Sequence, residues 1–131
     1  MLVDLNKNGL QETKREGLKI NGHADIFIAD CDISDDVSAD SVMQVTVGKF
    51  GRLDYAVNCA GYPGHFGHTA EWGTEEFDKV LRINVRGTWL FMRAQLQQMR
   101  KQTPLEAKRS VCQITSIDIL VPRFQDKGAR L

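Results

Sequence analysis

The sequence predicts an α/β fold in which helices cover both faces of a mainly parallel sheet. Short apolar segments rich in β-forming residues alternate with longer segments of helical periodicity, in the order strand, helix, strand, helix, strand, helix, strand. Strands that are joined through helices are expected to run parallel, with right-handed crossovers. The chain has 131 residues, of which 42% are hydrophobic, and this suffices for one core. We therefore expect a single domain over residues 1–131.

The first half of the chain is predicted to hold two strands and two helices. These elements are a strand at 1–4, a helix to about 18, a strand at 24–31 and a helix from 34 to about 49. Asn21-Gly22 supplies a stop for the first helix, and Phe50-Gly51 ends the second. Ser34 is the expected start of the second helix, because its hydroxyl can cap free amides and acidic residues follow it.

The second half is dominated by one long predicted helix. Its elements are a strand at 53–58, a glycine-containing loop at 61–73, a helix from 75 to about 100 that opens with Thr74 as a cap, and a strand at 110–116; residues beyond 116 show no clear element. Phe77, Asn84 and Phe91 recur every seven residues and predict the inward face of the helix. The same stripe also contains Leu81, Thr88, Gln95 and Met99.

Composition argues against several classes of partner. Seventeen basic residues balance seventeen acidic ones without long blocks of either sign, so we expect no nucleic-acid and no membrane partner. No apolar run approaches the roughly 20 residues that cross a bilayer, and the N-terminus lacks signal-peptide order, so a cytoplasmic location is expected. The three cysteines are interpreted as small hydrophobes, and His65 and His68 lack further ligands, so we expect no metal site.

Polar residues at the ends of predicted strands are candidate ligand contacts, because parallel α/β sheets bind ligands at that edge. Asp4 ends the first strand, and the simpler alternative to a ligand contact is that it is a surface residue that begins a turn. Asp32 follows the second strand, where Asp30 is a competing candidate and turn formation is the simpler role. Asn84 lies on an apolar helix face, where an unpaired amide costs on the order of a few kcal/mol. It therefore needs a partner, and structural and functional roles are equally open.

Four motifs resemble the short-chain dehydrogenase/reductase family, and they occur in the family's order. Asn58-Cys59-Ala60-Gly61 resembles Asn-Asn-Ala-Gly, with Cys59 in place of the second Asn. The turn beginning at Asp32-Ile33 resembles the family's Asp-Val-Thr/Ser turn, and the segment around Asn84 resembles Asn-Val-x-Gly. Gln113-Ile114-Thr115-Ser116 is similar to the family's Asn-Ile-Ser-Ser.

The resemblance implies an incomplete Rossmann-like, doubly wound parallel sheet of about four strands with flanking helices. It also implies an NAD(P)-dependent oxidoreductase that moves hydride between nicotinamide and an alcohol or carbonyl substrate. Asp4 would bind the adenosine ribose, which favours NAD, although Lys7 keeps NADP possible. The further residues implied by the motifs are Asp32, Ile33, Asn58, Ala60 and Gly61 for the cofactor, Asn84 for a proton relay and Ser116 for the substrate oxygen.

Two family motifs are absent from the chain. The family's glycine-rich turn would precede Met1, and its Tyr-x-x-x-Lys would follow Ser116, but Tyr55 and Tyr62 have no Lys four residues later. We therefore expect a truncated chain of impaired catalysis. The missing strand would lie between the first and third predicted strands, so two strand pairs must either close up or leave unpaired backbone groups around a gap. Marginal stability and weak dinucleotide binding follow from unpaired amides there.

The alternative function is that of a non-catalytic truncated product that pairs with a full-length relative. Trp89, Arg93, Leu96 and Arg100 share a second face of the long helix, and in this family that helix packs in dimer interfaces. The resemblance thus implies a possible homo-oligomer through the helix at 75–100. The same stripe is equally consistent with an outer surface of mixed polarity.

Overall fold

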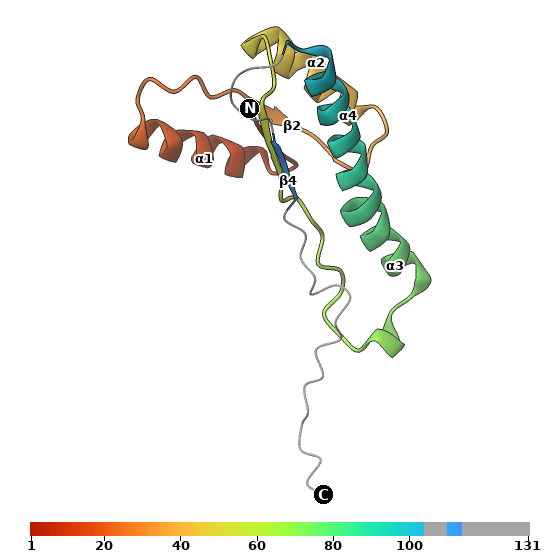
Figure 1. The fold of residues 1–131 in the computed structure, drawn as a ribbon. Coiled ribbons are helices and arrows are strands. Elements are labelled where there is room, and N and C mark those ends of the chain that lie inside the picture. Colours follow the sequence, from red (N-terminus) through yellow and green to blue (C-terminus); the bar gives the residue numbers. More distant parts are fainter. Residues whose placement is uncertain (104–109, 114–131) are drawn as a thin grey trace, which may run out of the picture.

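The computed structural model describes residues 1–103 and 110–113 and confirms the predicted alternation of strands and helices (Figure 1). The main elements are β1 (Leu2–Asp4), α1 (Lys7–Ile20), β2 (Ile28–Asp30), α2 (Ser38–Phe50), β3 (Tyr55–Asn58), α3 (Thr74–Leu81), α4 (Thr88–Lys101) and β4 (Ser110–Gln113). A 3-10 turn, Thr69–Glu71, precedes α3, and a π-helix, Arg82–Gly87, joins α3 to α4. No described helix is long and apolar enough to cross a bilayer.

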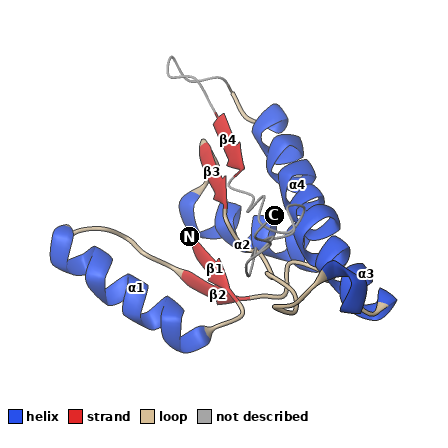
Figure 2. Ribbon diagram, turned by 90° about the horizontal axis from the view of Figure 1, so that it is seen from below, coloured by secondary structure: helices blue, strands red, loops and turns tan. Residues whose placement is uncertain are grey.

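The four strands form two parallel pairs and not one continuous sheet. β1 pairs with β2, so that Asp4 lies opposite Asp30, and β3 pairs with β4, so that Asn58 lies opposite Gln113. Figure 2 shows the two pairs as separate ribbons. Among the described residues no ladder joins β1 to β3, so of the two predicted alternatives the structure shows the gap and not the closed sheet.

Helices lie on both sides of the strands. α1 lies along one side of β1 and β2, while α2 and α4 pack side by side on the other (Figure 1). The core between these layers consists of Ala39, Val42, Leu90, Phe91 and Ala94, with Val3, Cys31, Ile33 and Met43 packed against it. These apolar side chains recur at helical spacing in α2 and α4, which is why the two helices face each other.

The C-terminal ends of the helices were predicted more accurately than their N-terminal starts. Gly51 ends α2 in the left-handed conformation, φ 79°, and its N–H donates to Val47 O at 2.8 Å. The predicted start at Ser34 is wrong, because Asp32 Oδ1 accepts the Ser34 N–H and holds it in a turn, so α2 begins at Ser38. The predicted Thr74 cap is also wrong, since α3 is preceded by Gly73 and shows no side-chain cap.

The long helix predicted at 75–100 is continuous but contains the π-helix. Asn84, Phe91, Gln95 and Met99 are buried as predicted, whereas Phe77 is 49% exposed and Leu81 is 37% exposed. The π turn is wider than an α turn, so it rotates the buried face of the preceding α3 away from Phe77. Val80, at 1% exposure, occupies the inward position there.

The strands are shorter than predicted. β2 covers only 28–30 of the expected 24–31, because its three-residue partner β1 offers no longer ladder. Leu53 lies outside β3, since its amide bonds to the Gln102 side chain. The last predicted strand is observed at 110–113, and its residues 114–116 lie outside the described residues. The interpretation of the cysteines as small hydrophobes holds for half-buried Cys31 but not for Cys59 and Cys112, which are exposed.

Candidate functional site

The carboxyl ends of β1 and β2 bring two acids together. Asp4 and Asp30 are opposite partners in the ladder, and both are exposed. Asp4 Oδ1 accepts the Asn6 N–H at 2.8 Å, so the predicted ligand contact is also a turn residue. Lys7 Nζ lies 3.1 Å from Asp30 Oδ2, and its hydrogen bond is the main cause that lowers the pKa of Asp30. The sheet edge thus carries two carboxylates and one ammonium.

The turn after β2 is fixed by its own acid. Asp32 Oδ1 accepts the Ser34 N–H at 2.8 Å. The pKa of Asp32 is lowered first by this backbone hydrogen bond and then by the Ser34 hydroxyl. Asp32 thereby performs the turn role that the sequence left open, and its side chain remains exposed at the surface.

Gly87 docks this turn against the long helix. A Cβ at Gly87 would lie 2.8 Å from Ile33 O, so only glycine allows the two backbones to come this close. Arg86 adds a bond to Ser34 O at 3.4 Å and an ion pair with Asp36. Neither residue was among the candidates predicted from the sequence, although Gly87 is the glycine of the Asn-Val-x-Gly motif.

Asn84 is buried, with 6% exposure, and lies in the π-helix. Its Oδ1 accepts the Tyr62 N–H at 2.7 Å, and its Nδ2 donates to Tyr62 O at 2.8 Å. A Cβ at Gly61 would lie 3.4 Å from Asn84 Oδ1, so Gly61 lies beside this amide at van der Waals distance. The partner that the buried amide requires is therefore the backbone just after the Ala60-Gly61 turn. π-helices are frequent at functional sites.

A second amide pair fixes the end of β3. Asn58 Nδ2 donates to Gln95 Oε1 at 2.8 Å, and Gln95 Nε2 donates to Asn58 Oδ1 at 2.7 Å. Gln95 is 5% exposed and lies on the inner face of α4. From there it fixes the side chain of Asn58, one of the predicted cofactor-binding residues. The sequence placed Gln95 on that face but did not assign it a partner. The available signal was the desolvation cost of a buried amide.

The loop between β3 and α3 is attached to α3. The Tyr62 hydroxyl bonds Glu76 Oε1 at 2.8 Å, and Lys79 Nζ lies 4.1 Å from the centre of the Tyr62 ring. Gly64 has φ +75°, and a Cβ there would lie 2.5 Å from the Trp72 ring. The loop is thus packed through a glycine that no larger residue could replace without movement.

One cavity of about 430 Å³ brings part of the predicted cofactor set together. It is lined by Ile33, Asn58 and Ala60, together with Gly87 and Gln95 among others. Small residues and amide groups at strand ends suit close approach of a dinucleotide. Gly61 lies against Asn84, Asp4 ends β1, and Asp32 lies in the turn after β2. Ser116 lies outside the described residues, so its position relative to this group stays a prediction.

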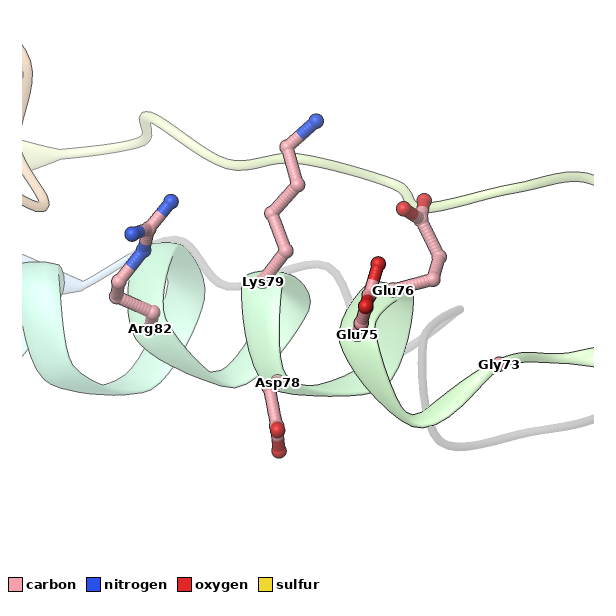
Figure 3. Close-up of a pocket in the computed structure, with 6 residues that line it drawn as sticks. All are labelled: Gly73, Glu75, Glu76, Asp78, Lys79 and Arg82. Carbon is pink, nitrogen blue, oxygen red and sulfur yellow. The ribbon is translucent and has the colours of Figure 1, made fainter.

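A different hollow, of about 630 Å³, lies on the surface of α3 (Figure 3). It contains none of the predicted site residues, and its charged side chains project in different directions from one helix. We therefore assign the candidate site to the strand ends. Among the described residues no group of three or more His, Cys, Asp or Glu side chains is arranged to hold a metal ion.

Comparison with known proteins agrees with the four motifs. The family profile described as Enoyl-(Acyl carrier protein) reductase matches residues 1–125. Levodione reductase of Leifsonia aquatica is 35% identical over 101 residues, 77% of this chain and 38% of that protein. A crystal structure of levodione reductase gives a TM-score of 0.78 at 31% identity, covering 86% of this chain and 42% of that chain.

Two further solved structures show the same relationship. A short-chain dehydrogenase from Mycobacterium smegmatis is 28% identical with a TM-score of 0.70, over 85% of this chain and 43% of that one. An alcohol dehydrogenase from the archaeon Thermococcus sibiricus, complexed with 5-hydroxy-NADP, is 25% identical with a TM-score of 0.68, over 76% and 42%. The chain spans about two fifths of the length of these proteins. With its profile match, motif order and incomplete Rossmann-like fold, it belongs to the short-chain dehydrogenase/reductase family.

Proposed function

We propose that this chain supplies the adenosine- and nicotinamide-facing strand ends of an NAD(P)-dependent oxidoreductase that acts on an alcohol or carbonyl group. The observation that carries the proposal is the contact of Asn84 with both backbone groups of Tyr62, which fixes the Ala60-Gly61 turn beside the cavity. A turn without bulky side chains, held from behind, is suited to close approach of a planar ring. Relatives named as a levodione reductase and an alcohol dehydrogenase support this substrate class.

The residues at the strand ends would hold the dinucleotide in a defined order. Asp4 would accept the ribose hydroxyls, Asp32 and Ile33 would face the adenine, and Asn58 would border the nicotinamide side. The cofactor, when bound, supplies or accepts the hydride. The chain's own part is to bind and orient it, because the amide of Asn84 bonds the Tyr62 backbone directly after the Ala60-Gly61 turn.

We further propose that NAD is preferred over NADP. Asp4 and Asp30 lie opposite each other at the ribose edge, and the nearby Lys7 is already paired with Asp30. The net charge of this group is negative, so a 2′-phosphate would be repelled. One relative was solved with 5-hydroxy-NADP, so the family resemblance alone does not select NAD, and the proposed preference rests on the charges at this edge.

Asn84 and Ser116 are the proposed reaction-side residues. The Asn84 side chain uses one N–H and one lone pair in its hydrogen bonds to Tyr62, and a side-chain amide has two of each. One N–H and one lone pair therefore remain with which Asn84 would bind a relay water. Ser116 would donate its hydroxyl to the substrate oxygen and stabilise charge that develops there. We also propose a cytoplasmic location for the protein.

The proposal is tested by titration of the 131-residue chain with NADH and with NADPH, following nicotinamide fluorescence. We expect saturable NADH binding that weakens about tenfold in Asp4→Ala, because the variant loses the carboxylate that would accept the two ribose hydroxyls. Asp25→Ala is the matched control, since Asp25 is an exposed acid paired with Lys49 and belongs to no strand end. NADPH should bind more weakly than NADH.

Two results would refute the cofactor proposal. Equal loss of binding in Asp4→Ala and Asp25→Ala would show that the edge formed by β1 and β2 does not read the ribose. Complete absence of binding in a chain whose circular dichroism shows helices and strands would favour the alternative, a non-catalytic product that pairs with a full-length relative.

A further inference from the structure

The loop after β3 and the start of α3 enclose a further hollow, of about 460 Å³, which we call the loop hollow. Its lining includes Tyr62, His65, Phe66, Glu71 and Trp72. Among the described residues, none that lines the loop hollow also lines the 430 Å³ cavity at the strand ends. Small-molecule sites have volumes in this range and combine aromatic walls with a few polar groups. The loop hollow is therefore a candidate site separate from that of the dinucleotide.

Trp72 is packed into the wall of the loop hollow with an unpaired donor. A Cβ at Gly64 would lie 2.5 Å from Trp72 Cη2 and 3.0 Å from Val80 Cγ2, so the six-membered ring of the indole is packed beside Gly64 and Val80. The Nε1–H belongs to the other ring of the indole. It is buried and has no hydrogen-bond partner among the described residues. Because an unpaired buried donor destabilises a protein, this N–H indicates a ligand that brings an acceptor.

Two carboxylates supply acceptors at the same place. Glu76 lines the loop hollow, and its Oε1 accepts the Tyr62 hydroxyl at 2.8 Å. A Cβ at Gly67 would lie 3.6 Å from both Glu71 Oε2 and His65 Nε2, so the carboxylate and the imidazole border the same part of the loop. A ligand in the loop hollow thus meets acceptors in the carboxylates and a donor in the indole.

The charges around the loop hollow select an uncharged ligand. Glu71 and Glu76 would repel an anion. Lys79 Nζ already lies 4.1 Å from the centre of the Tyr62 ring, so this ring has its cation, and a second ammonium would be repelled. A purely apolar ligand would cover the carboxylates and the indole N–H without giving them partners. Hydroxyl groups satisfy both kinds of group, because each can donate and accept.

We propose that the loop hollow binds a saccharide, an uncharged ring that carries hydroxyl groups on its rim and C–H groups on its faces. One hydroxyl oxygen accepts the Trp72 Nε1–H, and other hydroxyls donate to the carboxylates of Glu71 and Glu76. A C–H face of the sugar packs on the ring of Phe66, which is 84% exposed. Since the indole N–H is buried before binding, the Trp72 ring shifts when the hydroxyl reaches it, and its N–H signal reports the contact.

The probe is methyl β-D-glucopyranoside, titrated into the full 131-residue chain without dinucleotide and followed by NMR of the indole N–H groups. The chain has two tryptophans, and the second, Trp89, lies in α4 outside the lining of the loop hollow. We expect a saturable downfield shift of the Trp72 signal and an unchanged Trp89 signal. Trp89→Phe assigns the two signals. The assay contains no cofactor, so its outcome is independent of the proposed function.

Two variants test the contacts by calorimetric titration with the same glucoside. Trp72→Phe keeps an aromatic face but loses the donor, and Glu71→Ala loses an acceptor, so each should weaken binding about tenfold. Glu75→Ala is the matched control, because Glu75 is an exposed acid in the first turn of α3 that does not line the loop hollow. Circular dichroism of each variant checks folding. If Trp72→Phe does not fold, Glu71→Ala carries the test, because its side chain is exposed.

Three results would overturn the proposal. Absence of a Trp72 shift at the highest glucoside concentration would show that the indole N–H meets no sugar hydroxyl. Equal binding by the wild type and Glu71→Ala would place the glucoside elsewhere on the chain. Tighter binding of tetramethylammonium than of the glucoside would identify the loop hollow as a cation site.

Discussion

Replacement of Asn84 by alanine separates the structural part of the site from its chemistry. The side chain is 6% exposed and makes two hydrogen bonds to Tyr62, of 2.7 and 2.8 Å. Asn84→Ala leaves the Tyr62 N–H and C=O without these partners. A buried unpaired group costs about 1–3 kcal/mol, and Tyr62 is only half-buried, so we take the lower end for each group.

The expected loss of unfolding free energy is therefore about 2 kcal/mol, which lowers Tm by about 8 °C for a chain of this size. Urea denaturation followed by circular dichroism measures the first quantity, and a thermal scan measures the second. Hydrogen exchange of the Tyr62 amide should accelerate in the same variant, since its acceptor is gone. Asn21→Ala is the control, because Asn21 also accepts a backbone N–H, that of His23 at 3.1 Å, but is exposed.

Asn84→Asp distinguishes the two hydrogen bonds. The carboxylate can still accept the Tyr62 N–H but cannot donate to Tyr62 O, so slow exchange of the Tyr62 amide should be kept while stability falls. A change below about 0.5 kcal/mol in Asn84→Ala, with unaltered exchange at Tyr62, would refute the reasoning. The buried amide would then be held by water and not by the loop.

Three further outcomes follow from other contacts. Gly87→Ala should destabilise the chain by about 1–3 kcal/mol in urea denaturation, because its Cβ would meet Ile33 O at 2.8 Å, whereas Gly48→Ala, with open space around it, should not. The pKa of Asp32, measured by NMR titration, should lie below its ordinary 3.8 in the folded chain and return to it in urea; the stabilisation is complete above the unfolded value and is lost as pH falls through the folded value. We propose that the outer face of α4 pairs two copies, so Leu96→Arg, at a residue 45% exposed, should convert a dimer to a monomer in sedimentation velocity; a wild-type monomer would contradict this.

The sequence predicted the order of elements because hydrophobic periodicity is a local property. Prediction of the element boundaries was less successful where two local structures, such as a helix cap and a turn, compete for the same backbone amide. Ser34 has the composition of a helix cap, yet Asp32, two residues earlier, takes its amide and delays the helix to Ser38. The prediction that Phe77 points inward was also wrong. The π-helix that rotates Phe77 outward leaves no periodic signal in the sequence.

The motifs name candidate site residues, but they do not predict the contacts of these residues. The amide of Asn84 on an apolar helix face predicts that a hydrogen-bond partner exists. In the structure this partner is the backbone of Tyr62, 22 positions away. No pattern in the sequence can name a backbone partner, because every residue carries the same groups. Gln95 and Gly87 went unassigned because their roles depend on which distant segment the fold brings against them, the Asn58 side chain for Gln95 and the Ile33 backbone for Gly87.

Three bidentate amide contacts together set the position of the turn beside the cavity. Gln102 bonds both backbone groups of Leu53, Gln95 bonds the side chain of Asn58, and Asn84 bonds both backbone groups of Tyr62. The residue number on the helical segment falls from contact to contact as the number on the segment containing β3 rises. The two segments therefore run antiparallel, and the three contacts follow one line between them. A slip of the helix by one residue would rotate every amide by about 100° and break all three contacts at once. The Ala60-Gly61 turn is therefore either held in this register or released entirely, which makes the cofactor-facing edge of β3 a consequence of helix register.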